Sequence, residues 1–406
     1  MIKVTLQAQT EQIGRSNSTL EDHVEFSGLN AGVCYMPATF EALKSQPTET
    51  KIKRGKSTIG RTHHSVAGHV EMSVVIEDIP KICAMVLNNL GEYNTSEKSA
   101  RYTVMQDVPA KELELYKKWY NKFVKLICKK YDCINPTLPN AMDLYKEKKC
   151  KLSPSQVDKL AMENARYMIS VFTPTTMAYT TSIRQFNYII DWCRRMFAEE
   201  TENVFYMRVA KHMNDLADKL EEIAYVENLR DTKNRSFNLF DKDIEAVRNI
   251  EPFFGYAYQT IYKGSFAQLA QAQRHRTLDY KAYFDGNASL FYVPPIIADD
   301  EDLVKRWLSE CTLLAGNFPQ ATLVDILEMG TVDNFLLKTK ERECGCAQLE
   351  IQNQTVAIHS DYENAITDPV LIEKFEGYKK KVRCGFTDYE CKSPCVWGLK
   401  SNERLI

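Results

Sequence analysis

Apolar residues at helical spacing alternate along the chain with short β-branched runs, and this pattern predicts a mixed α/β protein. Residues 109–130 are the clearest helix, because apolar side chains recur every three or four positions and lysines occupy the opposite face. Residues 70–76 are rich in valine and predict a strand, whereas residues 45–58 are polar and predict an exposed loop. Further helices are predicted over residues 81–89, 152–172, 182–195, 202–225, 300–314 and 319–340.

The second half of this pattern repeats the first. Residues 76–91 align without a gap with residues 261–276, and in both a β-rich segment precedes a slim helix and a polar loop. Two helices then follow at similar distances. We therefore predict tandem repeats, each a small mixed sheet packed with long helices. The expected divisions are an N-terminal segment (1–60), a first repeat (61–228), a second repeat (229–365) and a cysteine-containing tail (366–406).

Composition narrows the class of protein. The 406 residues are 44% hydrophobic and 26% charged, which is typical of a soluble globular chain. The net charge of −2 argues against a partner that is polymeric nucleic acid. The sequence has no run of 18 apolar residues that would predict a membrane span, and its first residues lack the pattern of a signal peptide. Twelve unevenly spaced cysteines suggest reduced thiols, and we expect a cytoplasmic protein.

Arg274, His275 and Arg276 place three nitrogen-rich side chains just after an apolar helical run. Arginine forks bind phosphate or planar carbonyl groups in a bidentate way, and a neighbouring histidine can donate to the same ligand. The alternative is a solvated basic helix end that interacts with its own dipole. Glu97, Ser99 and Arg101 alternate, so in an extended segment they would form one binding edge; the alternative is a solvated loop.

Histidines and cysteines raise the question of a metal. His63, His64 and His69 have no carboxylate or cysteine at ligand spacing nearby, so we expect them to bond a ligand or the core instead. The tail cysteines, with Cys344 and Cys346, do not have the spacing of a standard zinc ribbon. We expect free thiols there and assign no metal ligands; the alternative is a structural zinc held by these thiolates.

These residues resemble the flavin-dependent thymidylate synthase family, called ThyX. Its signature has the form RHR-x-x-S-x-N-x-x-S-x-R-Y, and here the signature is split between the two halves. Arg274-His275-Arg276 resembles its start, and Glu97-Lys-Ser99-Ala-Arg101-Tyr102 resembles its end. The first half has Asn89-Leu90-Gly91 in place of the start. The second half has Ala282, Phe284 and Gly286 in place of the glutamate, serine and arginine.

Other segments are similar to the same family. His63-His64-Ser65 resembles its histidine-rich strand start, although Gly68 stands where a flavin-contacting glutamate is usual. Gln271 matches a nucleotide-contacting glutamine, and Arg166 and Arg184 match arginines that serve nucleotide and flavin. The segment from Arg342 to Gln352 closely resembles the family's C-terminal block, in which the arginine grips the pyrimidine.

The resemblance implies an enzyme that methylates C5 of dUMP, with FAD as cofactor and NADPH and methylenetetrahydrofolate as cosubstrates. It implies catalytic roles for Arg342, which would stabilise charge on the uracil carbonyl, and for Ser99 as a binding hydroxyl. The implied substrate-binding residues are Glu97, Ser99, Arg101, Arg166, Gln271, Arg274 and Arg342. The implied cofactor-binding residues are His63, Ser65, Arg184, Asn187, Arg274, His275 and Arg276.

Because the family is a homotetramer with sites built from several subunits, the resemblance also implies a homodimer of fused chains as a pseudo-tetramer. Two alternatives stay open. One is a related enzyme that adds another carbon unit, such as hydroxymethyl, or acts on another pyrimidine nucleotide. The other is a catalytically silent homologue that binds nucleotide or flavin.

Overall fold

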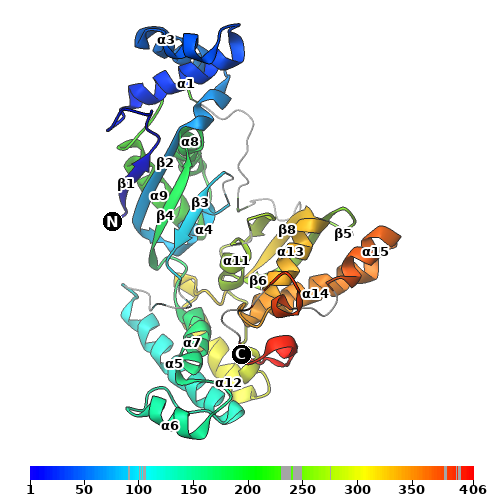
Figure 1. The fold of residues 1–406 in the computed structure, drawn as a ribbon. Coiled ribbons are helices and arrows are strands. Elements are labelled where there is room, and N and C mark those ends of the chain that lie inside the picture. Colours follow the sequence, from blue (N-terminus) through cyan, green and yellow to red (C-terminus); the bar gives the residue numbers. More distant parts are fainter. Residues whose placement is uncertain are drawn as a thin grey trace. The chain divides into compact units, whose positions relative to one another are not determined.

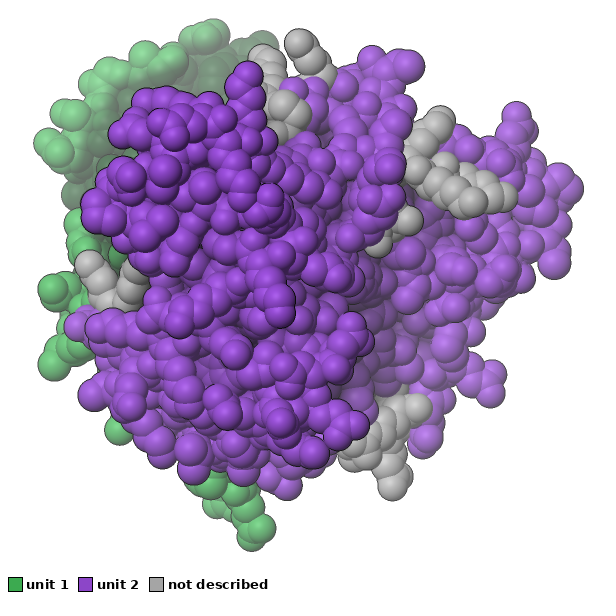
Figure 2. Space-filling view, turned by 90° about the horizontal axis from the view of Figure 1, so that it is seen from below, with its two compact units in different colours: residues 1–98, 174–237 green, residues 99–173, 238–406 purple. Residues whose placement is uncertain are grey.

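The computed structural model describes residues 1–89, 92–99, 101, 103, 107–229, 239–240, 249–274, 276–378, 382–389, 391 and 395–406. His275 and Tyr102, together with Leu90 and Gly91, lie outside these residues. The chain forms two compact units, shown in different colours in Figure 2. Unit 1 contains residues 1–98 and 174–237, and unit 2 contains residues 99–173 and 238–406. This division differs from the predicted repeats, since residues 99–173 group with the second half of the chain.

Unit 1 is built on a four-stranded antiparallel sheet in the order β1-β2-β4-β3 (Figure 1). These strands are β1 (Lys3–Gln9), β2 (Glu71–Pro80), β4 (Pro174–Ser182) and β3 (Asn94–Glu97). Along β2 the alternate residues Met72, Val74 and Ile76 are buried, because successive side chains of a strand point to opposite faces. The predicted strand over residues 70–76 is therefore confirmed, and it extends to Pro80.

The helices of unit 1 include an amphipathic pair, α8 and α9, that pack against each other. They begin at side-chain caps, Ser182 for α8 and Asn203 for α9, whose oxygens accept from backbone N–H groups of the first turn. The elements are α1 (Leu20–Tyr35), α2 (Phe40–Lys44), α3 (Thr48–Gly60), η1 (His64–His69), α4 (Lys81–Leu87), α8 (Ile183–Ala198) and α9 (Val204–Glu221).

The expectation of an exposed loop over residues 45–58 is wrong, because most of this segment belongs to helix α3. Helix α3 packs closely on α1, and a Cβ atom at Gly28 would lie only 1.8 Å from the carbonyl oxygen of Lys51. The polar residues of α3 are used in this contact, since Lys51 forms an ion pair of 2.6 Å with buried Glu25 on α1. The polar pattern of this segment resembles that of a loop because the partner helix that binds its polar residues lies elsewhere in the sequence.

Unit 2 contains a second antiparallel sheet in the order β5-β6-β8-β7. Its strands are β5 (Phe253–Phe254), β6 (Ala257–Ser265), β8 (Leu323–Thr331) and β7 (Asp279–Tyr283). Its longer helices are α5 (Ala110–Tyr131), α6 (Ala141–Lys148), α7 (Pro154–Ala165), α11 (Phe266–Ala272), α12 (Glu301–Leu313), α13 (Val332–Arg342), α14 (Leu349–Ala365) and α15 (Pro369–Glu376). Its short helices are η2 (Arg166–Met168), η3 (Pro295–Ile297), η4 (Ala315–Asn317), η5 (Arg383–Gly385) and η6 (Gly398–Glu403).

The helices α5 and α12 meet through aromatic side chains. Trp119 and Trp307 pack edge to face with their ring centroids 4.8 Å apart, and Phe123 lies against both. Trp119 also donates its indole N–H to the Glu310 carboxylate at 2.8 Å, so the polar atom of a buried ring is satisfied. The helix predicted over residues 109–130 is confirmed.

The helix predicted over residues 319–340 is wrong in its first part. Residues 323–331 form strand β8, and helix α13 begins only at Val332. Five consecutive residues of β8, 324–328, are buried, so both faces of the strand are covered there and it lacks the clear alternation of a half-exposed strand. The helix predicted over residues 152–172 ends at Ala165, where the chain passes into η2.

The mixed α/β fold is confirmed, and the two sheets have the same strand order. Counted along the chain, the second strand of each sheet runs directly into a short slim helix, β2 into α4 and β6 into α11. The last strand of each sheet along the chain likewise runs directly into a longer helix, β4 into α8 and β8 into α13. A repeated unit would produce this correspondence. None of the helices in the described part of the chain combines the length and apolar character of a membrane span.

Candidate functional site

A buried polar network in unit 2 is centred on Arg166, which follows helix α7. Its side chain donates from Nη2 to the backbone oxygen of Ala267 at 3.3 Å and to the side-chain oxygen of Gln348. The backbone N–H of Gln348 in turn donates to Oε1 of Gln271 at 3.1 Å. The structure therefore brings together two predicted substrate-binding residues, Arg166 and Gln271, through a third residue of the family-like C-terminal block.

Glu350 extends this network on the other side of Gln348. Its carboxylate accepts from the Tyr167 hydroxyl at 2.6 Å and from the backbone N–H and hydroxyl of Ser265 at 2.8 and 2.6 Å. Burial raises the pKa of Glu350 above its ordinary value, and the hydrogen bonds from Ser265 and Tyr167 oppose that rise. Sequence reasoning assigned no role to Tyr167, Ser265 or Glu350. The only signal was the position of Glu350 inside the C-terminal block.

Arg101 is held by a second carboxylate. Its Nε donates to Glu163 at 3.0 Å, and its Nη2 donates to the backbone oxygen of Cys346 at 2.8 Å. Arg404 reaches the same place, because it lies 3.7 Å from Glu163 and donates to the backbone oxygen of Gly345 at 2.9 Å. Burial alone would raise the pKa of Glu163, but the charges of Arg101, Arg404 and Arg166 lower it below its ordinary value. Glu163 and Arg404 were not predicted.

Two predicted site arginines, Arg101 and Arg274, lie within electrostatic reach of two others, Arg166 and Arg342. Burial lowers the pKa of Arg166 to about 10, and the positive charges of Arg101 and Arg274 add to this effect. Burial also lowers the pKa of Arg342, and the same two arginines contribute. These four guanidinium groups, together with Arg404, outnumber the carboxylates of Glu163, Glu341 and Glu350 near them, and such an excess of positive charge is suited to an anionic ligand.

Two of these arginines have a buried hydrogen-bond donor that could bind a ligand. The Nε atoms of Arg166 and Arg342 are buried, and no described residue supplies a hydrogen-bond acceptor for either atom. A buried donor without an acceptor costs free energy, so such an atom is expected to meet an acceptor from a ligand. Arg274 and Arg276 are exposed, which leaves their guanidinium groups accessible to solvent.

Glu97 and Ser99 do not continue one extended edge. Glu97 is the last residue of β3, and its carboxylate binds Lys81 and accepts from Asn88 at 3.4 Å within unit 1. Beyond it, the backbone N–H of Thr103 donates to the Ser99 oxygen at 3.1 Å, which closes a turn in unit 2. The extended conformation therefore continues only to Lys98, whose backbone N–H still donates to the backbone oxygen of Thr176 at 3.0 Å, and the turn begins at Ser99.

The predicted cofactor residues of unit 1 differ in their environments. Asn187 on α8 is fully buried, and its amide bonds the backbone of Val226 and of Leu229. His63 bonds the Tyr35 hydroxyl, Ser65 is exposed, and Arg184 is buried in the first turn of α8. Asn187 thus fixes the position of a backbone segment.

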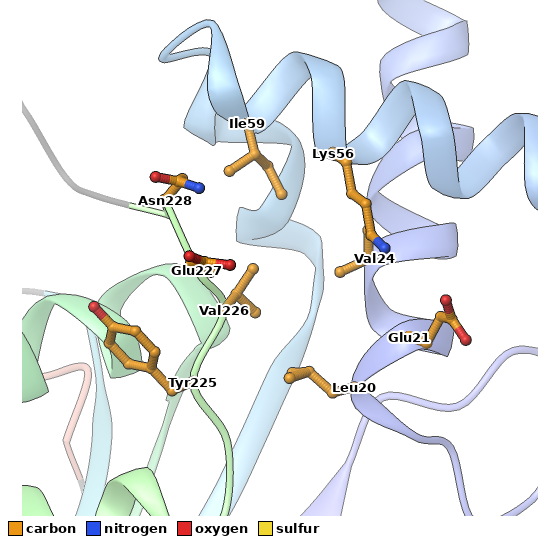
Figure 3. A pocket seen from close by; sticks show the side chains of 9 residues that line it. All are labelled: Leu20, Glu21, Val24, Lys56, Ile59, Tyr225, Val226, Glu227 and Asn228. Atoms are coloured by element: carbon orange, nitrogen blue, oxygen red, sulfur yellow. The ribbon is translucent and has the colours of Figure 1, made fainter.

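The segment that Asn187 holds forms one wall of a cavity of about 490 Å³ in unit 1, shown in Figure 3. Helices α1 and α3 supply the opposite wall, and Lys56 and Glu21 provide charges of opposite sign. The lining residues are Leu20, Glu21, Val24, Lys56, Ile59, Tyr225, Val226, Glu227 and Asn228. A cavity of this size with an apolar wall and a few polar groups is typical of a small-molecule site.

Within the described residues, no group of three or more histidine, cysteine, aspartate or glutamate side chains has a geometry that could hold a metal ion. All twelve cysteines are free thiols in the structure.

Comparison with known proteins links part of the chain to a family. Residues 21–214 match the family model of Thy1, the thymidylate synthase complementing protein. This match includes Arg101, Arg166 and Asn187, whereas Arg274 and Arg342 lie outside it. No curated protein matches the sequence.

Two solved structures are similar to parts of this chain. Thymidylate synthase X from Helicobacter pylori, solved with FAD and dUMP, is 14% identical with a TM-score of 0.30, covering 55% of this chain and 93% of its own. The UMP/dUMP methylase PolB from Streptomyces cacaoi, bound with 5-Br dUMP, is 11% identical with a TM-score of 0.32, covering 55% of this chain and 89% of its own.

Proposed function

We propose that this chain is a flavin-dependent enzyme that methylates C5 of the uracil ring of dUMP. The family-model match over residues 21–214 supports this reaction class. The observation that carries the proposal is the cationic region around Arg166, where two buried guanidinium Nε atoms have no acceptor among the described residues. A nucleotide monophosphate combines a dianionic phosphate with carbonyl oxygens, so it can satisfy such donors.

In this proposal the arginines have two different roles, nucleotide binding and stabilisation of charge in the transition state. Arg101, Arg166 and Arg274 hold the phosphate and position the nucleotide. Arg342 is a permanent cation and stabilises negative charge that develops on a uracil carbonyl oxygen in the transition state. Gln271 and Gln348 keep the Arg166 fork in place through the hydrogen bonds described above. Ser99 offers a hydroxyl to the ring, and Glu97 remains a predicted nucleotide contact.

FAD is the proposed cofactor, and when bound it supplies the hydride and one-carbon chemistry, with NADPH and methylenetetrahydrofolate as cosubstrates. The unit 1 cavity fits part of such a molecule, because the apolar side chains of Val24, Ile59 and Val226 suit a ring system and Lys56 suits a phosphate or carbonyl group. Asn187 holds the backbone of this wall in place through the hydrogen bonds described above. His63, Ser65 and Arg184 are proposed contacts of FAD. In unit 2 the proposed contacts are Arg274, His275 and Arg276.

We further propose that the chain arose by tandem duplication and works as a homodimer. The shared strand order of the two sheets supports duplication. The split of the family-like signature supports the dimer, because each half retains what the other lacks. The native mass of the purified protein tests the dimer, for which twice 46.7 kDa is expected.

The visible absorbance spectrum of the purified protein, before and after addition of dUMP, tests the proposed activity. An oxidised-flavin spectrum that dUMP perturbs supports the proposal. If the flavin spectrum responds only to another pyrimidine nucleotide, that nucleotide is the substrate instead of dUMP. If the protein binds no flavin after reconstitution with FAD, the proposed enzyme activity is wrong, and a catalytically silent homologue is the remaining interpretation. Product analysis by mass then distinguishes a methyl from a hydroxymethyl group.

A further inference from the structure

Three cysteine thiols from two distant segments meet beside one turn of unit 2. The turn runs from Cys344 to Ala347 and is closed by a hydrogen bond of 2.8 Å from Ala347 N to Cys344 O. Cys395 comes from the C-terminal segment, and a Cβ atom at Gly345 would lie 3.0 Å from its sulfur. The Cys395 thiol therefore rests directly against the turn that carries the other two cysteines.

The three thiols influence one another and are chemically unequal. The neighbouring Cys346 thiol lowers the pKa of Cys344 to about 7, whereas Cys346 and burial raise the pKa of Cys395. Cys344 is therefore the most acidic of the three, but it is buried, and Cys346 is the exposed thiol of the cluster.

The cluster can be reached from solvent. Cys346 is exposed, and Cys346 and Cys395 both line a cavity of about 320 Å³. Trp397, Lys159 and Arg404 also line this cavity. Cys346 can therefore meet a disulfide from solvent, and the cations of Arg101, Lys159 and Arg404 outnumber the carboxylate of Glu163 in this lining, which favours an anionic reagent.

We propose that Cys346 and Cys395 form a reversible disulfide by exchange with a low-molecular-weight disulfide of the oxidised glutathione type. Such a modification lies beyond the proposed methylation of dUMP. It assigns a chemical role to thiols that the proposed reaction does not use.

The exchange balances in two steps. Cys346, which is exposed, loses its proton to water and attacks the reagent; the reagent's S–S bond breaks, and one small thiolate leaves. Cys395, which lines the same cavity, then loses its proton, attacks the Cys346 sulfur and releases the second small thiolate.

The bond would join the C-terminal segment to the turn that supports Arg101. The backbone oxygen of Cys346 accepts from Arg101, and Arg404 donates to the backbone oxygens of Gly345 and Ala347. A disulfide here closes a long loop and reduces the freedom of the unfolded chain. Its link to nucleotide binding rests on the proposed function, but the bond itself does not.

Peptide mapping of the full-length protein tests the proposal. The reduced protein is incubated with oxidised glutathione, alkylated and cut with trypsin. Cleavage after arginine and lysine gives one peptide over residues 343–374, with Cys344 and Cys346, and another over residues 393–400, with Cys395. The expected product is these two peptides joined and lighter by two hydrogen atoms, and dithiothreitol should separate them.

Variants identify the sulfurs. Cys346→Ser and Cys395→Ser should each abolish the joined peptides, while Cys391→Ser in the same tail should retain them. A final product with the bond inside residues 343–374 would overturn the proposal, as would glutathione adducts alone or unmodified thiols. The reaction needs no flavin and no nucleotide, so its failure is distinct from failure of the proposed enzyme activity.

Discussion

Arg166 donates a hydrogen bond to the side chain of Gln348, which lies 182 positions further along the chain. Through the backbone of Gln348 the same network reaches Gln271 on α11. Three distant segments of unit 2 therefore fix one guanidinium group whose Nε remains without an acceptor among the described residues. The geometry of the candidate site depends on this arrangement.

Replacing Arg166 by lysine should weaken dUMP binding by a factor of about 10–100. Lysine keeps the charge but loses the fork, and one charge-assisted hydrogen bond contributes roughly 1.5–3 kcal/mol. Titration of the flavin spectrum with dUMP measures the affinity. Arg194→Lys is the matched control, because Arg194 is a partly exposed residue of unit 1 paired with Asp218 and Glu221. Equal affinities for the Arg166 variant and the control, with both proteins folded by circular dichroism, would remove Arg166 from the nucleotide site.

Glu163 should make the stability of the protein depend on pH in the acid range. Its pKa is lowered below the ordinary value of 4.5 in the folded protein. As the pH falls below 4.5, the unfolded chain takes up the proton first, so the free energy of unfolding decreases. Urea unfolding of wild type and Glu163→Gln checks this. Their difference should be large at neutral pH and shrink in acid; a difference that is constant with pH would contradict the role of this carboxylate.

Gly28 and Gly60 should respond oppositely to alanine. A Cβ atom at Gly28 would lie 1.8 Å from the Lys51 oxygen, so α1 and α3 must separate, at a cost of about 1–3 kcal/mol. At Gly60, the last residue of α3, no atom lies within 4 Å of such a Cβ. Gly60→Ala should therefore leave stability unchanged or raise it by up to ~1 kcal/mol. Thermal unfolding compares the two variants, and equal Tm values would show that α1 and α3 pack less closely than described.

Lys338 and Glu328 form a fully buried ion pair of 2.6 Å in unit 2, and Tyr258 and Tyr262 donate to the same carboxylate. Lys338→Met should cost about 3–5 kcal/mol, because it leaves the Glu328 charge buried without its cation. Adding Glu328→Gln should restore part of this loss, since the amide oxygen still accepts from the tyrosines. The free energies of unfolding in urea test both steps. A double variant less stable than Lys338→Met would show that the charge itself was not the cause.

Local sequence predicted the elements whose periodicity is strong and missed those defined by distant partners. The apolar stripe from Leu113 to Ile127 predicts α5 without further information, although it omits the buried Leu115 and Trp119. Lys338 reads as a solvent-facing residue of α13, and only strand β8 shows that it is buried against Glu328. The same limit applies to the candidate site. Arg166 and Gln271 were predicted, whereas the contacts of Glu163 with Arg404 and of Ser265 with Glu350 join segments whose proximity no local pattern indicates.

The two units are interleaved in the sequence, and this imposes an order on their folding while the ribosome makes the chain. All residues of unit 1 precede position 238, so this unit can fold while the rest of the chain is still being made. Residues 99–173 must wait, because Trp119 on α5 packs against Trp307 on α12, which is translated much later. During that interval an aromatic helix is exposed on the nascent chain. The long α5 segment is therefore where chaperone protection would matter most as this protein is made.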